Sequence, residues 1–188
     1  MSSHHIVRDK QEPALLIMDL TDFDFEHLGQ LLEWSPTVIA SQSEYEHVDS
    51  LGIKVDAIVT SPLHTHLQES TLIIRTENNP LQDALKYLVG EQYPSVNIID
   101  ASFCEKDYIL YIGRINLVVL TPHQRIFPVN SGFSKWKAEG EEITILHGVK
   151  NLKTSGLIKM TEQKYRTEKD GFYTLTFEQP FTFVGEAL

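Results

Sequence analysis

The spacing of apolar residues changes partway along this chain of 188 residues, and that change constrains the fold more than any other feature. Up to about Ile112, short apolar runs alternate with segments of helical period, which is typical of a mainly parallel sheet covered by helices. Beyond that point, apolar and polar residues alternate with a period of two, as in antiparallel strands joined by hairpins. We therefore expect an N-terminal α/β domain over residues 1–130 and a smaller antiparallel all-β domain over residues 131–188.

Five segments of the first half have the short apolar character of buried strands: Ala14–Met18, Thr37–Ala40, Ala57–Thr60, Thr71–Thr76 and Val96–Ile99. Helices are expected between them. Asp22 is predicted to cap the first, and the Ser43–Glu46 segment has the capping-box form that starts the second. The third has Asn79 as its cap, Pro80 at the first helical position and Gly90 just past its end.

The second half contains several segments with strand-like alternation: Leu117–Leu120, Arg125–Val129, Ile143–Leu146, Leu152–Lys159, Phe172–Phe177 and Phe181–Val184. Tyr173, Leu175 and Phe177 share one face of their strand, so they are expected to form an aromatic-rich core. The polar stretch Asn130–Gly132 is predicted to mark the boundary between the two domains.

The charge and composition of the chain indicate which classes of binding partner to expect. The net charge of −10 repels phosphodiester backbones, so nucleic acid is not expected as a partner. The sequence has no apolar run long enough to span a bilayer and a polar N-terminus, so we expect a cytoplasmic protein without membrane association. Cys104 is the single cysteine and is interpreted as an ordinary thiol. The pairs His4–His5 and His64/His66 lack a third ligand at metal-binding spacing.

In an open α/β sheet, ligands bind beyond the carboxyl ends of the strands. The loops expected there are mostly neutral in this chain: Ser41–Ser43, Ser61–His64, Glu77–Asn79 and Asp100–Cys104. The sequence contains no Walker A loop, no G-x-G-x-x-G fingerprint and no G-x-S-x-G elbow. The commonest phosphate-binding loops and the acyl-transfer elbow are therefore absent from it.

Several sequence segments resemble motifs of the thiamine pyrophosphokinase family, and they occur in the same order and at similar spacing over roughly residues 14–177. The segment Ser50–Val59 resembles the family's L-G-I-K-P-D sequence and the apolar residues after it. Ala84-Leu85 followed by Val96–Ile99 resembles its helix and next strand. Phe133–Trp136 and Leu152–Leu157 resemble the start of its thiamine-binding domain.

The resemblance implies a transfer of pyrophosphate from ATP to thiamine, yielding AMP and thiamine diphosphate. It implies that residues 1–130 correspond to the catalytic domain, with ATP and Mg²⁺, and residues 131–188 to the thiamine-binding domain. It also implies a homodimer with a thiamine or nucleotide-like ligand. A Mg²⁺ ion that bridges phosphates needs carboxylate oxygens, so the acids of the family motifs matter most.

Four acidic motifs of the family are replaced here by segments that lack most of their acids: Ser41–Tyr45, Val59–Leu63, Thr76–Pro80 and Phe103–Tyr108. In the last of these, Glu105 also reverses the charge of the family's arginine. Only Glu77 and Asp107 keep an acid at a family position. They are the candidate metal ligands if a remnant site persists, and Asp107 is the candidate catalytic residue. We expect both acids to lie within one cleft at the carboxyl ends of neighbouring strands. Each is otherwise interpreted as a solvated loop carboxylate.

Ser43 and Asn79 stand at expected helix N-termini, where backbone N–H groups can bind phosphate, so they are the candidate nucleotide-binding residues. The group Asp19, Asp22 and Asp24 follows the first strand and could supply new carboxylates, although capping by Asp22 accounts for part of it.

Three hypotheses follow from these residues. The first is a thiamine pyrophosphokinase homologue that has lost most of its apparatus for ATP and Mg²⁺ and acts as a binding or regulatory protein, with no cofactor at all as one outcome. The second is an active thiamine pyrophosphokinase with displaced acids. The third is an interaction protein without a small ligand. The sequence does not decide whether the chain is an enzyme.

Overall fold

The computed structural model describes residues 12–34, 37–61, 66–77 and 79–188. The chain divides into two compact units, residues 1–117 and 118–188, and each is described by itself. The predicted roles of residues 1–130 and 131–188 as catalytic-type and thiamine-binding-type domains stay predictions. The residues His4, His5 and His64 lie outside the described part of the chain.

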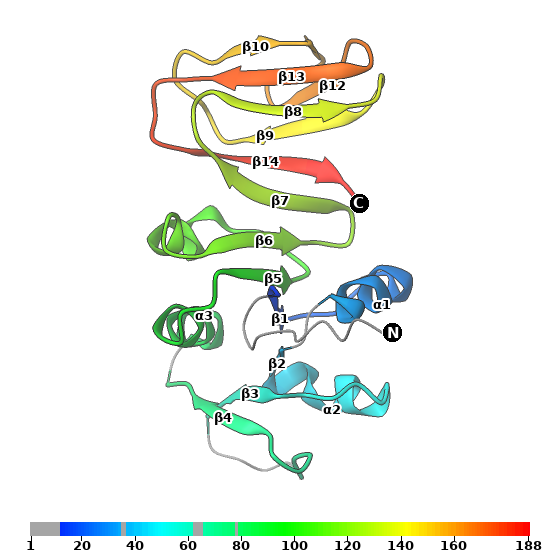
Figure 1. Ribbon diagram of the computed structural model, residues 1–188, viewed down its shortest axis with the longest axis vertical. Helices are drawn as coiled ribbons and strands as arrows, with labels where there is room; N and C mark the ends of the chain where they lie inside the picture. The colour runs from blue at the N-terminus through cyan, green and yellow to red at the C-terminus, as the bar shows by residue number, and fades with distance from the viewer. Residues whose placement is uncertain (1–11, 35–36, 62–65, 78) are drawn as a thin grey trace, which may run out of the picture. The chain divides into compact units, whose positions relative to one another are not determined.

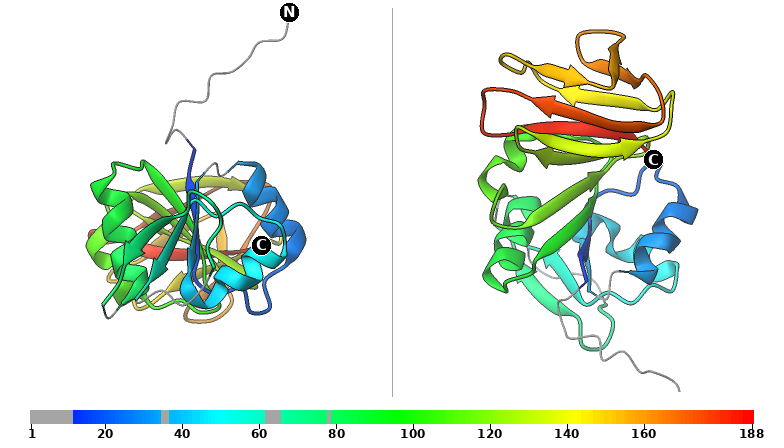
Figure 2. Two further views of the ribbon diagram at one scale, coloured as in Figure 1. Left: turned by 90° about the horizontal axis from the view of Figure 1, so that it is seen from below. Right: turned by 45° about the horizontal axis from the view of Figure 1, so that its top comes forward.

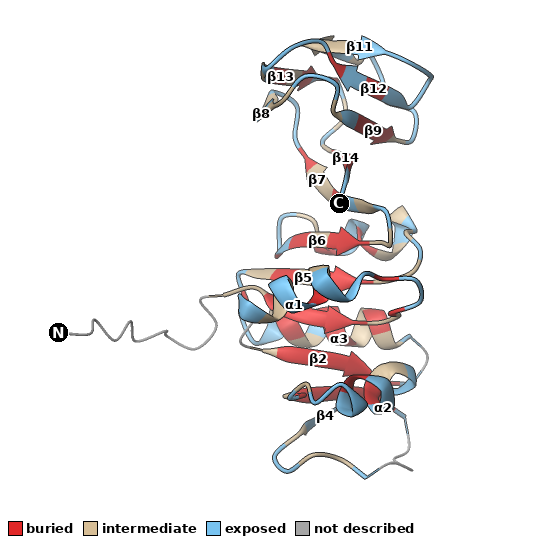
Figure 3. Cartoon of the chain, turned by 90° about the vertical axis from the view of Figure 1, so that its right-hand side faces the viewer, coloured by how far each residue is buried: buried red, intermediate tan, exposed pale blue. Residues whose placement is uncertain are grey.

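The described part of the first unit contains five parallel strands (Figure 1), which are β1 (Ala14–Ile17), β2 (Val38–Ser41), β3 (Ala57–Thr60), β4 (Leu72–Arg75) and β5 (Ser95–Ile99). Their order is β5-β1-β2-β3-β4, and every neighbouring pair is parallel. The strands β1, β2 and β3 are buried at every position (Figure 3). Burial on both faces explains why they are continuous apolar runs in the sequence.

Three α-helices cover the parallel strands: α1 (Phe25–Glu33), α2 (Gln42–Ser50) and α3 (Pro80–Gly90). Figure 2 shows α1 and α2 on one side of these strands and α3 on the other. The apolar stripe of α3 is buried as predicted, and the Asn79 side chain caps the helix by accepting from the backbone N–H of Gln82. Two short 3₁₀ helices follow β5, η1 (Glu105–Asp107) and η2 (Ile109–Tyr111).

Two of the predicted helix caps are wrong. The cap of α1 is Asp24, whose Oδ1 accepts from the N–H groups of Glu26 and His27 at 2.7 and 3.1 Å. Asp22 instead has a φ of +58°, in the left-handed region. The α2 helix starts at Gln42 with Ser41 as its cap, so the capping box at Ser43 does not form.

The second unit is antiparallel, as predicted. The hairpin of β6 (Asn116–Leu120) and β7 (Gln124–Val129) leads into it, and β6 spans the division between the units. One layer continues from β7 in the order β7-β14-β9-β12-β11, with these bounds: β14 (Thr182–Ala187), β9 (Glu142–Leu146), β12 (Lys164–Thr167) and β11 (Leu157–Lys159). The second layer is the sheet β10-β13-β8, made of β10 (Lys153–Ser155), β13 (Gly171–Thr176) and β8 (Phe133–Lys137).

The two layers share one core. Tyr173 and Leu175 of β13 pack with Ile143 and Ile145 of β9 and with Val184 of β14. Tyr173 and Leu175 are fully buried, which confirms the face predicted from the alternation. The fold class predicted from the sequence, an α/β unit with a mainly parallel sheet followed by a smaller antiparallel unit, is confirmed.

One predicted strand is divided in two. The segment Leu152–Lys159 was expected to be continuous, but β10 pairs with β13 in one layer and β11 pairs with β12 in the other. Gly156 lies between them with a φ of +72° and lets the backbone turn from one layer to the other. The strands β8 and β12 were not predicted.

No helix within the described ranges has both the length and the apolar character needed to cross a membrane.

Candidate functional site

The carboxyl ends of β1 and β5 are the first place to look for a site. The chain proceeds from β1 outward through β2, β3 and β4 and then returns to place β5 on the other side of β1. Such a reversal of strand order opens the crevice in which α/β sheets bind ligands. Two backbone donors close this end of the strand pair, because the N–H groups of Met18 and Asp19 lie 2.9 and 3.3 Å from the carbonyl oxygen of Ile99.

Three aspartates interact electrostatically at this switch point. Burial raises the pKa of Asp100, and the negative charges of Asp19 and Asp107 raise it further, against the lowering effect of the Ser102 N–H. The neighbouring Tyr108 is buried, and burial raises the pKa of its phenol with a contribution from Asp100 and Asp107. The negative charges of Asp19 and Asp107 therefore act on Asp100 at the end of β5.

The ends of β2 and β3 carry neutral side chains that bond to one another. The buried Ser41 hydroxyl donates to the carbonyl oxygen of Met18 at 3.0 Å and lies 2.9 Å from the Ser43 hydroxyl. The Thr60 hydroxyl lies 2.6 Å from Oε1 of Gln42. These hydrogen bonds join α2 to β1 and β3 where the family resemblance would place carboxylates.

Glu77 and Asp107 were expected at the ends of neighbouring strands, and that expectation is wrong. Glu77 follows β4 and is exposed, whereas Asp107 lies in η1 after β5, and three strands separate β4 from β5. The half-buried Asp107 is linked to α3, because Nε2 of Gln82 donates to its carbonyl oxygen at 2.6 Å. The catalytic role of Asp107 and the metal-binding role of both acids stay predictions.

The neutral side chains at the ends of β2 and β3 do not fit a Mg²⁺ site of the kind the resemblance implies. Among residues 12–34, 37–61, 66–77 and 79–188, no three His, Cys, Asp or Glu side chains are grouped so that they could hold a metal ion. Asn79 uses its side-chain oxygen as the α3 cap, and Ser43 bonds to Ser41. The nucleotide-binding role proposed for these two residues stays a prediction. Cys104 is exposed.

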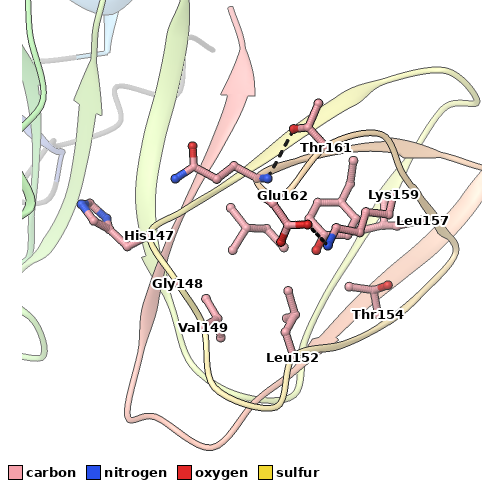
Figure 4. A pocket seen from close by; sticks show the side chains of 12 residues that line it. His147, Gly148, Val149, Leu152, Thr154, Leu157, Lys159, Thr161 and Glu162 are labelled. Atoms are coloured by element: carbon pink, nitrogen blue, oxygen red, sulfur yellow. Dashed lines mark hydrogen bonds and ion pairs between the residues drawn. The ribbon is translucent and has the colours of Figure 1, made fainter.

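The second unit contains a pocket of about 880 Å³. Its lining residues come from β9, β10, β11, β12 and the segments that join them (Figure 4): Ile145, His147, Gly148, Val149, Leu152, Thr154, Leu157, Lys159, Thr161, Glu162, Gln163 and Tyr165. The volume lies within the range of about 300–1,000 Å³ that is typical of small-molecule sites.

The pocket has an apolar part and a charged part. Val149, Leu152 and Leu157 are partly buried and pack against the core of the unit, to which Ile145 and Tyr165 belong. On the charged side, Lys159 and the exposed Glu162 form an ion pair (Figure 4). The distance from Nζ of Lys159 to Oε1 of Glu162 is 2.9 Å. A pocket with aliphatic and aromatic lining and a few charged groups suits a small organic ligand.

Some residues of the pocket and of the switch point could be predicted from the sequence. The segment Leu152–Leu157, singled out by its family resemblance, contributes three pocket residues. Tyr165 lies in β12 and Gln163 directly precedes it, and this strand was not predicted. Asp19 was named as a possible new acid. Asp100 was missed as a site residue, although its position just after an apolar strand would have been a sufficient signal.

No family model and no curated protein matches this sequence. The fold itself, a parallel α/β unit followed by an antiparallel β unit, is that of the thiamine pyrophosphokinases. The structure is similar to thiamine pyrophosphokinase from Bacillus subtilis, at 9% sequence identity and a TM-score of 0.66, covering 94% of this chain and 99% of that one.

Two further structures show the same likeness. A thiamin pyrophosphokinase family protein from Enterococcus faecalis has 13% identity, a TM-score of 0.66 and coverage of 94% of this chain and 99% of that one. Thiamin pyrophosphokinase from Candida albicans has 11% identity, a TM-score of 0.65 and coverage of 94% and 90%. The family resemblance seen in the sequence is therefore confirmed as a likeness of fold.

Proposed function

We propose that this chain is a thiamine pyrophosphokinase-like protein that binds a small organic ligand in the pocket of its second unit and has lost most of the pyrophosphokinase chemistry. The observation that carries the proposal is the origin of the pocket. Leu152, Thr154 and Leu157 line it, and they belong to the segment whose sequence resembles the family's thiamine-binding domain. This proposal does not require the homodimer or the binding of ATP and Mg²⁺ that the resemblance implies.

The chemistry of the pocket suits a ligand with a cationic heteroaromatic ring, such as the thiazolium ring of thiamine. Leu152 and Leu157 offer apolar contact to a ring, and Tyr165 adds an aromatic surface. The Glu162 carboxylate offers a negative charge to a cationic ring if it exchanges its partner Lys159 for the ligand. An exposed ion pair contributes little stability, about 0–1 kcal/mol, so this exchange costs little.

The loss of pyrophosphokinase chemistry is supported by the neutral side chains at the ends of β2 and β3. The hydroxyl and amide groups of Ser41, Gln42 and Thr60 bond to their neighbours and carry no charge for a metal ion. Loss of one preorganised electrostatic group commonly costs about 10²–10³ in rate, so several losses together should abolish useful turnover.

The ligand proposal predicts a stabilising effect that does not need metal. Thiamine, thiamine diphosphate, AMP and ATP would each be added with and without Mg²⁺ while the Tm is followed. We expect thiamine or its diphosphate to raise the Tm without Mg²⁺, because a ligand at 100 times its Kd adds about 2.7 kcal/mol to the free energy of unfolding.

A pair of adjacent residues provides the control for that panel. Leu157→Ala should weaken the binding several-fold, because Leu157 lines the pocket, whereas Ile158→Ala should leave it unchanged, because Ile158 is exposed and does not line it. Equal effects of the two substitutions, or no Tm response to any of the four compounds, would count against the ligand proposal.

The second candidate, an active enzyme with displaced acids, is favoured by one observation. Asp19, Asp100 and Asp107 interact at the switch point of the parallel sheet, where an α/β enzyme would hold its nucleotide. This arrangement offers carboxylates at the ends of β1 and β5 in place of those absent from β2 and β3.

An assay of AMP release from ATP and Mg²⁺, with and without thiamine, separates the two candidates. We expect no measurable thiamine-dependent release. Turnover at ordinary enzyme rates that is abolished by Asp107→Ala or Asp100→Asn would establish the second candidate instead. Turnover that depends on Asp22 or Asp24 would show that the acids have moved to the loop after β1.

A further inference from the structure

A buried carboxylate in the second unit is surrounded by more positive charge than it neutralises. Glu186 of β14 is only 1% exposed. Its Oε2 accepts from Nη2 of Arg125 at 2.9 Å and from Nζ of Lys135 at 2.6 Å, and Nζ of Lys137 lies 3.4 Å away. The phenol of Tyr173 lies 3.3 Å from Oε1. We call Arg125, Lys135, Lys137 and Glu186 the Glu186 cluster.

The charges in this region do not balance. Three cations face Glu186, and the one further carboxylate paired with them is that of Glu141, 3.7 Å from Lys137. The ion pairs among the described residues therefore leave an excess of one positive charge in this region, within a chain whose net charge is −10. A cluster of positive charge on a protein of net negative charge creates a local positive potential, which attracts small anions.

The cations are both fixed and accessible. Phe127 packs against two of them, with its ring centre 5.7 Å from the Arg125 guanidinium carbon and 5.1 Å from Nζ of Lys135. The side chains of Arg125, Lys135 and Lys137 are nevertheless 44%, 29% and 19% exposed. A guanidinium has five N–H donors and an ammonium three, so donors remain for a ligand on the solvent side.

The lowered pKa of Lys135 is consistent with a site that has more positive than negative charge. Burial lowers the pKa of its ammonium, Glu186 opposes that effect, and the positive charges of Arg125 and Lys137 lower the pKa further. A second anion near these three groups would reduce their mutual repulsion. Guanidinium and ammonium groups together are well matched to phosphate oxygens.

We propose that Arg125, Lys135 and Lys137, held in place by Glu186 and Phe127, form a binding site for a small phosphate-bearing anion. The site is made of residues from β7, β8 and β14 and none of its residues lines the pocket of the second unit. It therefore does not depend on the function proposed above.

Isothermal titration of the full chain with inorganic pyrophosphate and with inorganic phosphate tests the site. We expect binding of pyrophosphate that weakens about tenfold in Arg125→Gln and in Lys137→Gln, because hydrogen bonds to charged groups are the stronger ones. Lys164→Gln is the matched control, since it removes an exposed lysine of the same unit that pairs with Glu142 instead. Its affinity should stay within about twofold of the parent chain.

Arg125→Lys provides a check that does not depend on loss of charge. It keeps the positive charge but removes the planar fork, so its affinity for pyrophosphate should fall between those of the parent and Arg125→Gln. Urea unfolding of each variant ensures that only folded protein is compared. Absence of pyrophosphate binding at millimolar concentration, or equal weakening in Lys164→Gln, would overturn the proposal.

Two further titrations, with ATP and with thiamine diphosphate, distinguish a free inorganic anion from a phosphorylated organic ligand. Tighter binding of ATP or thiamine diphosphate than of pyrophosphate, with the same loss in Lys137→Gln, would assign the site to a phosphorylated organic ligand. Equal affinities would assign it to the free inorganic anion.

Discussion

Replacing Glu186 with glutamine should destabilise the second unit by about 2–3 kcal/mol, because the buried carboxylate loses its hydrogen bonds to charged groups while the cations that remain are partly exposed. Glutamine keeps the size and the hydrogen-bonding oxygen, but it leaves Arg125, Lys135 and Lys137 without the charge that they share. The free energy of unfolding in urea measures the effect. Glu141→Gln is the control: Glu141 is 42% exposed and makes one 3.7 Å ion pair in the cluster, so its loss should cost less than about 1 kcal/mol.

The same substitution predicts a dependence on pH. Burial raises the pKa of Glu186, but the hydrogen bonds and charges of Lys135, Arg125 and Lys137 outweigh it, so the pKa of the folded protein lies below the ordinary value of 4.5. The stabilisation is therefore present above pH 4.5 and is lost as the pH falls through the lower folded value. The difference between the parent chain and Glu186→Gln should shrink below pH 4.5. A difference that stays constant down to pH 3 would contradict the ionised state of Glu186.

Replacing Gly156 with alanine should destabilise the second unit by about 2–4 kcal/mol, from left-handed backbone strain and overpacking together. A Cβ at this position would lie 2.8 Å from the carbonyl oxygen of Phe172 and 3.3 Å from Cα of Tyr173, and both of these are backbone atoms that cannot move aside as a side chain would. Thermal and urea unfolding measure the loss.

Gly140→Ala separates the two contributions. Gly140 has a φ of +84°, close to that of Gly156, but a Cβ there would have no heavy atom within 4 Å. Its replacement should cost only the backbone strain, about 1–2 kcal/mol. If the two alanine variants lose equal stability, the close approach of the Phe172 backbone is not what requires glycine at position 156.

The sequence predicted the parallel strands well because burial on both faces makes them unbroken apolar runs, as in β1 and β3. It predicted the caps less well. Three aspartates lie within six residues before α1, and the choice of Asp24 over Asp22 depends on a left-handed φ at Asp22 that sequence spacing does not show. The strand β8 was missed because a serine and a lysine separate its two aromatic residues, Phe133 and Trp136, and break the period-two alternation.

The pocket and the Glu186 cluster also differ in how far the sequence could predict them. The pocket could be anticipated where the local segment Leu152–Leu157 carries a recognisable sequence. The Glu186 cluster could not, because its partners Arg125 and Lys135 lie 61 and 51 residues away in the chain and only the pairing of β14 with β7 and the stacking of two layers bring them together. Likewise, Glu77 and Asp107 follow strands that are consecutive in the chain, yet strand order places three others between them.

The crossing of the chain at Gly156 links the cooperativity of the second unit to its pocket. Because β10 and β11 belong to different layers and are joined by one residue, neither layer can open without pulling a strand out of the other. Local opening of either layer alone is thereby suppressed, and the two should exchange their amide hydrogens as a single unit. Thr154 of β10 and Leu157 of β11 line the pocket on the two sides of that crossing. A bound molecule would therefore contact both layers and stabilise them together.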